Sequence, residues 1–244
     1  QRGLPPLDPD LLEGLGLLEN TLVIVTTDHG HLFGEHGMLG KPGSGHGDST
    51  LYQPMAHIPL LVWHPDFKSQ AGLRRTQLVQ PVDYYPTVLD AMGVQPRGQT
   101  LHGQSLLPLL GSRENRIRAH ACFGKFGEGM QVTDGAWTLS KWPPGEVNQP
   151  LHWHSVHPPE FIVPKGVGAF DRAQQCFPVD HVRGPAQDAL WFLPEDPDQE
   201  RNLIAEQPGQ RERLCGALRQ FLKEVNAPEE QAERLGLRNV NRDE

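Results

Sequence analysis

Residues 21–41 read TLVIVTTDHGHLFGEHGMLGK, and this stretch decides the fold that we predict. Residues 21–27 are apolar or β-branched without alternation, which is typical of a strand buried on both faces of a parallel sheet. Asp28 and His29 follow this strand directly. Ligands of open α/β sheets bind beyond the carboxyl ends of the strands, and a carboxylate beside an imidazole can bind a divalent cation. This pair is therefore our candidate metal site.

Lys41 follows Asp28 by thirteen residues, after a glycine-rich loop. A lysine ammonium at this place can act as a point charge for an anionic substrate. The residues alone also allow a plainer interpretation. In that interpretation Asp28 caps the next helix and His29 is a solvated loop residue.

The same stretch resembles the metal-binding segment of the formylglycine-dependent sulfatases, a family of the alkaline phosphatase superfamily. The resemblance rests on the apolar strand, the motifs DHG and GEHG, and the lysine in one register. Further segments occur in the order of that family: HIPLLV at 57–62, VDYYPT at 82–87, GQSLLPLL at 103–110 and an imperfect signature at 190–203. In the last segment Phe192 replaces the family's Asp and Gln199 replaces its Glu. The resemblance covers about residues 11–222 and is weakest at 143–187.

The resemblance implies roles for Asp28, His29 and Lys41, and two nearby histidines, His36 and His46, are weighed beside them. Asp28 and His29 would be metal ligands, and the metal of that family, usually calcium, holds a formylglycine and a sulfate oxygen. Lys41 would contact the sulfate and stabilise charge in the transition state. His36 has two interpretations, a catalytic role and a hydrogen bond from its ring that fixes the loop. His46, in a glycine-rich segment after Lys41, is a candidate for substrate contact.

Two features of that family have no counterpart in this sequence. The formylglycine arises from a Cys or Ser in the motif C/S-x-P-x-R, upstream of the strand, whereas Cys122, Cys176 and Cys215 all lie downstream. The family's N-terminal pair of metal-binding aspartates is also missing, since no two consecutive Asp residues occur. We therefore expect the C-terminal portion of a sulfatase (a sulfuric ester hydrolase), inactive by itself. The alternatives are a phosphate or phosphonate monoester hydrolase of the same superfamily and a truncated product without catalysis.

The composition limits the partners. With a net charge of −8 over 244 residues, the chain lacks the basic footprint that nucleic-acid binding requires. No apolar run approaches the ~20 residues of a membrane span. Three scattered cysteines form no disulfide framework and lean toward a cytoplasmic location, while compartment and oligomeric state stay open. The expected partner is a sulfated small molecule or glycan.

We predict an α/β fold of two parts. Residues 1–118 are expected to form the back half of an alkaline phosphatase-like mixed-sheet domain, with strands at 21–27 and 58–63 and a helix that Asp83 caps and Gly93 ends. Residues 119–244 are expected to form a small α+β subdomain with a polar tail. Short strands at 119–123, 129–133, 136–141 and 189–193 predict an antiparallel sheet there. Apolar residues at helical spacing predict a helix packed on it, namely Leu214, Leu218, Phe221, Leu222 and Val225.

A second group of histidines, His152, His154 and His157, has two interpretations. Alternate residues of a strand face the same side, which would suit a zinc site. No cysteine lies close, however, and prolines interrupt the segment. We therefore favour a histidine-rich loop at the mouth of a pocket, where it would select the organic part of the substrate.

Overall fold

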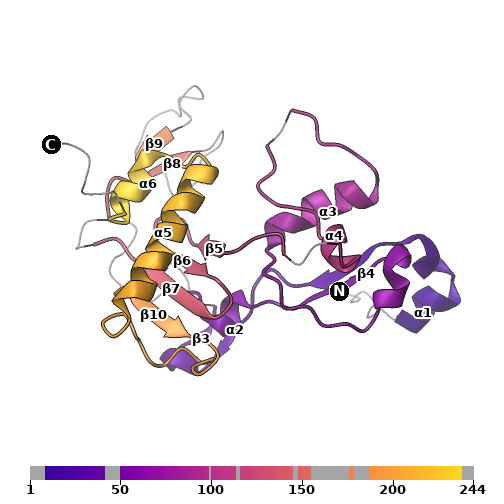
Figure 1. The fold of residues 1–244 in the computed structure, drawn as a ribbon, viewed down its shortest axis with the longest axis horizontal. Coiled ribbons are helices and arrows are strands. Elements are labelled where there is room, and N and C mark those ends of the chain that lie inside the picture. The colour runs from indigo at the N-terminus through magenta and orange to yellow at the C-terminus, as the bar shows by residue number, and fades with distance from the viewer. Residues whose placement is uncertain are drawn as a thin grey trace, which may run out of the picture. The chain divides into compact units, whose positions relative to one another are not determined.

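The computed structural model describes residues 9–41, 50–98, 100–113, 116–144, 148–154, 176–178 and 187–237. The chain forms two compact units, one of residues 1–30 with 57–119 and one of residues 31–56 with 120–244 (Figure 1). We expected residues 31–56 in the first part of the fold. They pack in the second unit instead, so the stretch that carries Asp28, His29 and Lys41 is divided between the two.

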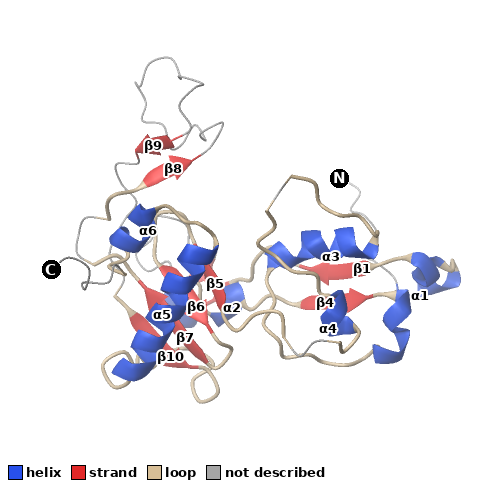
Figure 2. Cartoon of the chain, turned by 45° about the horizontal axis from the view of Figure 1, so that its top comes forward, coloured by secondary structure: helices blue, strands red, loops and turns tan. Residues whose placement is uncertain are grey.

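The first unit is built on a two-stranded sheet. Strand β1 (Val23–Thr26) pairs with β4 (Leu60–Trp63) in antiparallel register, with Val23 opposite Trp63 and Thr26 opposite Leu60. Figure 2 shows the helices α3 and α4 beside these two strands. The helices of this unit are α1 (Pro9–Gly14), α3 (Tyr84–Ala91) and α4 (Leu107–Leu110), with 3-10 turns at Leu17–Asn20, Pro65–Gln70 and Pro81–Asp83.

The expectation of a parallel strand buried on both faces is wrong for the described residues. Leu60 packs against a small core of Leu106, Leu109 and Ile117. The cross-strand pair Val25 and Leu61 is exposed, at 43% and 61% respectively. Successive side chains of a strand point to opposite faces, so the described residues leave the face that carries Val25 and Leu61 only partly covered. β1 also has a single partner strand there, and its other edge is open.

Helix α3 begins and ends as the sequence predicts, but not by the predicted cap. It runs Tyr84–Ala91, and Gly93 takes a φ of 65°, a left-handed conformation that costs glycine little. Asp83 occupies the N-cap position, yet its side chain makes no capping hydrogen bond to α3. The predicted capping role is therefore wrong, because the carboxylate is engaged elsewhere.

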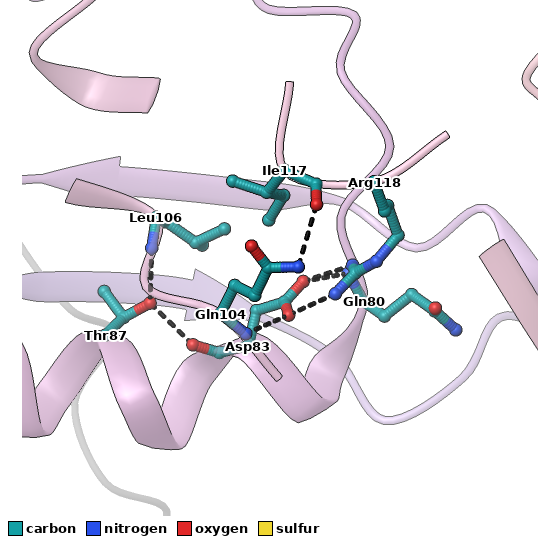
Figure 3. Close-up of polar contacts among 7 residues, drawn as sticks. All are labelled: Gln80, Asp83, Thr87, Gln104, Leu106, Ile117 and Arg118. Atoms are coloured by element: carbon teal, nitrogen blue, oxygen red, sulfur yellow. Dashed lines mark hydrogen bonds and ion pairs between the residues drawn. The ribbon is translucent and has the colours of Figure 1, made fainter. Parts of the chain in front are cut away.

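The Asp83 carboxylate is fully buried and lies at the centre of a polar network (Figure 3). Both of its oxygens accept hydrogen bonds from the Arg118 guanidinium. The backbone N–H of Gln80 donates to one oxygen at 2.7 Å, and that of Gln104 donates to the other at 2.9 Å. Four donors thus satisfy a charge that would be costly to bury alone.

The network continues through the backbone around α3. The Thr87 hydroxyl donates to the Asp83 carbonyl at 2.6 Å and accepts the Leu106 N–H at 2.9 Å. The backbone at Gly103 lies close to the backbone of Val82, since a Cβ at Gly103 would lie 1.8 Å from the Val82 carbonyl oxygen. Hydrogen bonds and close backbone packing therefore fix the start of α3 against the segment that leads into α4.

We predict that Asp83→Ala lowers the free energy of unfolding by about 3–5 kcal/mol, because it leaves the Arg118 charge largely buried without its partner. Urea denaturation measures this change. Asp66→Ala is the matched control, since Asp66 is exposed and the change should cost less than about 1 kcal/mol. A loss for Asp83→Ala no larger than the control's would contradict the role of the network.

The second unit has a four-stranded antiparallel sheet, and here the prediction is confirmed. The strand order is β10-β7-β6-β5, and α5 packs on this sheet. Leu214, Leu218 and Leu222 of the predicted helical stripe are buried against it. The elements are β5 (Ala121–Gly124), β6 (Met130–Thr133), β7 (Trp137–Lys141), β10 (Ala189–Phe192), α5 (Pro208–Glu224) and α6 (Glu229–Arg234).

Two further strand pairs and a short helix belong to the second unit. β2 (Leu32–Phe33) pairs with β3 (Leu39–Gly40), a short helix α2 spans Gln53–Ala56, and β8 (His152–His154) pairs with β9 (Cys176–Pro178). Among the described helices, none is both long and apolar enough to cross a membrane.

Candidate functional site

The candidate pair lies just beyond the carboxyl end of β1, where the chain turns sharply. The Thr27 hydroxyl donates to the His29 carbonyl at 3.2 Å, and the His29 N–H donates to Asp28 Oδ1 at 2.9 Å. The plainer interpretation of Asp28 as a helix cap is not realised, because the next element is the strand β2. The turn instead brings the carboxylate and the imidazole together.

One ring nitrogen of His29 is oriented by the backbone. Nδ1 lies 2.8 Å from the Gly30 carbonyl oxygen, and a carbonyl can only accept, so Nδ1 donates. In the neutral ring Nε2 then carries the lone pair that a metal needs. A backbone carbonyl that fixes the tautomer in this way is the usual second partner of a metal-binding histidine.

The two candidate ligand atoms converge. Nε2 of His29 and Oδ2 of Asp28 are 3.4 Å apart. Two ligands that bind one cation at right angles, each at ~2.0–2.5 Å, are themselves about 3.2 Å apart. The observed separation therefore fits a shared cation.

The charge of the pair also suits a cation. The pKa of Asp28 is lowered: desolvation acts to raise it, but the positive charge of a protonated His29 ring and hydrogen bonds from backbone N–H groups and the Thr27 hydroxyl outweigh that effect. The hydrogen bonds remain when the His29 ring is neutral, which is the form that can bind a cation. The carboxylate is thus ionised at neutral pH, as a ligand must be. Its side chain is 82% exposed, while that of His29 is 25% exposed.

The pair does not make a complete metal site. In the described ranges, no group of three or more His, Cys, Asp or Glu side chains is placed to hold a metal ion. Calcium takes six to eight oxygen ligands in its usual sites, far more than this pair supplies. Asp28 and His29 alone therefore supply too few ligands for a metal ion, and their role as metal ligands stays a prediction.

Lys41 directly follows the β2–β3 hairpin of the second unit. Leu32 pairs with Gly40, and the GEHG motif forms the connecting turn. Glu35 stabilises this turn by accepting the Phe33 N–H at 2.5 Å, and this bond is the main cause of the lowered pKa of Glu35. Lys41 is exposed. Because it belongs to a different unit from Asp28 and His29, its proximity to them stays a prediction.

His36 fixes the hairpin turn, although by stacking rather than by the hydrogen bond that we expected. Its ring lies on that of Tyr52 with centroids 3.5 Å apart and planes 9° apart. The Tyr52 ring in turn meets the edge of Trp191, at a centroid distance of 5.8 Å. Tyr52 is only 7% exposed, so the stack ties the hairpin to the sheet of the second unit. This favours the structural interpretation of His36.

Two buried glutamines, which we did not predict from the sequence, hold the chain after the lysine segment. Gln131 accepts the Leu51 N–H at 2.7 Å and donates to the Leu51 carbonyl at 3.2 Å. Gln199 accepts the Gln53 N–H at 2.7 Å. His46 itself lies outside the described residues, so its predicted contact with substrate stays a prediction.

The predicted histidine group at residues 152–157 is only partly described. His152 lies in β8 and pairs with Glu230 of α6 through its Nδ1 atom. This contact joins β8 to α6, which is a structural role. The side chain of His154 and all of His157 lie outside the described residues, so their predicted place at a pocket mouth stays a prediction.

We predict that His29→Ala weakens calcium binding by at least about tenfold in the full-length protein, because it removes the nitrogen that we expect to be a metal ligand. Isothermal titration with calcium measures the affinity. His64→Ala is the control, since His64 begins a 3-10 turn in the same unit and accepts the Asp66 N–H at 3.2 Å. Equal affinities for the two variants would remove His29 from the site.

Comparison with known proteins places these residues within a matched region. Residues 10–94 match the family model described as Sulfatase, a range that includes Asp28, His29 and Lys41. Over 98 residues the chain is 44% identical to Arylsulfatase K of Homo sapiens. That alignment covers 40% of this chain and 16% of the human protein, so the chain spans about a sixth of the length of this relative.

Solved structures share the fold over most of this chain. One was determined in complex with its substrate D-glucosamine-2-N,6-O-disulfate; it has a TM-score of 0.55 and 18% identity, covering 90% of this chain and 38% of that one. Another is the phosphonate monoester hydrolase of Agrobacterium radiobacter, with a TM-score of 0.56 and 19% identity, covering 89% of this chain and 37% of that one. At such identities the likeness concerns the fold alone.

Proposed function

We propose that this chain is a member of the sulfatase family of the alkaline phosphatase superfamily, and that it forms part of an enzyme that hydrolyses a sulfate ester to an alcohol and sulfate. The observation that carries the proposal is the convergence of Asp28 Oδ2 and His29 Nε2, 3.4 Å apart at the end of β1. The expected α/β fold agrees with it. We expect no turnover from these 244 residues alone, since they contain no C/S-x-P-x-R nucleophile motif.

Asp28 and His29 would hold a divalent cation on one side of the site, and the resemblance implies calcium. When bound, such a cation acts as a Lewis acid and a template for the sulfate group. Asp28 contributes the negative charge, and His29 contributes a nitrogen whose orientation the Gly30 carbonyl fixes. The formylglycine nucleophile would come from a part of the protein outside this sequence.

Lys41 would bind the sulfate oxygens and stabilise the negative charge that develops on them. Its place after a short, stacked hairpin supports this role, because a charge acts best when its backbone is held in position. The rigid elements on which it depends are the β2–β3 pairing and the stack of His36 on Tyr52.

The substrate would be a sulfated small molecule or glycan. The fold neighbour solved with a disulfated glucosamine supports a sulfated sugar as the first substrate to test. The net charge of −8 makes a nucleic-acid substrate a poor electrostatic fit.

A second candidate is hydrolysis of a phosphonate or phosphate monoester. The fold likeness to a phosphonate monoester hydrolase, at a TM-score of 0.56, favours testing it. A cation held by Asp28 and His29, together with Lys41, could bind either a sulfate-like or a phosphate-like tetrahedral anion. Parallel assays on aryl sulfate, phosphate and phosphonate esters separate the two functions.

We predict that Lys41→Ala lowers kcat/KM for a sulfate ester by roughly 10²–10³ in the full-length enzyme, because a donor to the developing charge is lost. Steady-state kinetics on an aryl sulfate measures this. The control is Lys68→Ala, which removes an exposed lysine of the first unit and should leave turnover unchanged. Near-normal turnover by Lys41→Ala would end the assignment of this lysine.

A further inference from the structure

A hydroxyl-centred junction lies at the end of β1, two residues before Asp28. The Thr26 hydroxyl is 2.8 Å from the Pro59 carbonyl, next to the start of β4. It is also 3.1 Å from the Tyr84 hydroxyl at the first turn of α3. Three segments that are distant in the sequence therefore meet at one oxygen atom.

The direction of these hydrogen bonds follows from counting donors. A threonine hydroxyl has a single hydrogen, and a carbonyl oxygen can only accept. The hydrogen of Thr26 therefore goes to the Pro59 carbonyl, the nearest acceptor. The Tyr84 hydroxyl must then be the donor to Thr26 Oγ1, so the contact requires the hydroxyl of Tyr84.

Tyr84 itself is held firmly from two sides. Its backbone follows Asp83, whose carboxylate is bound by Arg118 and by two backbone N–H groups. Its ring packs against the core formed by Leu106, Leu109 and Ile117. A rigid helix start thus presents the hydroxyl to the end of β1.

We infer that Tyr84 is a positioning residue for the candidate metal site, acting through the Thr26 hydroxyl to fix the point from which Asp28 and His29 emerge. This inference rests on the proposed function, because it assumes that Asp28 and His29 bind the cation. Tyr84 touches neither side chain in the contacts that the structure describes. Its effect is to limit the movement of the strand end, and a small displacement of a ligand weakens a metal site considerably.

The test is calcium affinity in the full-length protein, with variants that differ by one hydroxyl group. Tyr84→Phe keeps the ring and removes the donor, and we expect it to weaken calcium binding by roughly threefold to tenfold, less than the loss of a group bonded directly to a ligand. Thr26→Val removes the acceptor and should weaken binding by a similar factor. Thr26→Ser keeps the hydroxyl and should bind as the wild type does.

Tyr85→Phe is the matched control. Tyr85 is the next residue of α3 and is 53% exposed, so the same chemical change should leave calcium affinity unaltered. The melting temperature of the metal-free protein is measured for every variant. If Tyr84 has a positioning role, Tyr84→Phe should lower calcium affinity, while its melting temperature stays close to that of Tyr85→Phe.

Each outcome decides the inference. Equal calcium affinity for Tyr84→Phe and Tyr85→Phe overturns it, as does a fall in affinity accompanied by a large fall in the melting temperature, which would indicate a general structural role. The variant Asp28→Ala shows whether the positioning role of Tyr84 or the proposed metal site itself is wrong. If Asp28→Ala binds calcium normally, the metal site is wrong; if it loses calcium while Tyr84→Phe does not, only the positioning role is wrong.

Discussion

The ion pair between Asp83 and Arg118 is the interaction on which the first unit depends. Asp83 has no exposed surface, and the Arg118 side chain is 11% exposed. A buried pair of this kind adds little stability compared with apolar residues, but the loss of one partner is costly because it leaves an unpaired charge. The pair therefore acts mainly by fixing positions. Through Asp83 it holds the start of α3, the segment before α4 and Arg118 in one fixed arrangement.

The two units are stabilised in different ways. The second has a continuous apolar core between the four-stranded sheet, α5 and α6, in which Val132, Leu139 and Leu190 are completely buried. Among its described residues, the first has a core of three buried apolar side chains and a partly uncovered face on its two-stranded sheet. With so little apolar burial, its geometry relies more on hydrogen bonds to buried charge, which are directional and easily lost when one member is removed.

Elements with strong local patterns were predictable from the sequence. The four strands of the larger sheet follow from short segments separated by Gly and Pro, helix α5 follows from helical spacing, and α3 ends at Gly93 as expected. The pairs β2–β3 and β8–β9 were not predicted. Of the candidate site, the placement of Asp28 and His29 was predictable. These two residues come together because they directly follow the end of β1. For Lys41, thirteen residues further along, sequence spacing gives no such constraint.

Long-range pairings were not predictable from the sequence. Asp83 and Arg118 are 35 residues apart, and no periodicity connects them, so Asp83 looks like a helix cap. The stack of His36 on Tyr52 likewise depends on how the hairpin packs, which propensity does not specify. The apolar run of β1 predicts burial on both faces, but burial requires a covering layer that the described residues do not supply.

The central claim is that Asp28 and His29 bind one cation. Anomalous X-ray diffraction from crystals of the full-length protein grown with manganese, used as a substitute for calcium, tests it most directly, since it locates the ion itself. We expect one strong anomalous peak within about 2.0–2.6 Å of both Asp28 Oδ2 and His29 Nε2. A fully occupied ion elsewhere, with neither of these atoms among its ligands, would contradict the account.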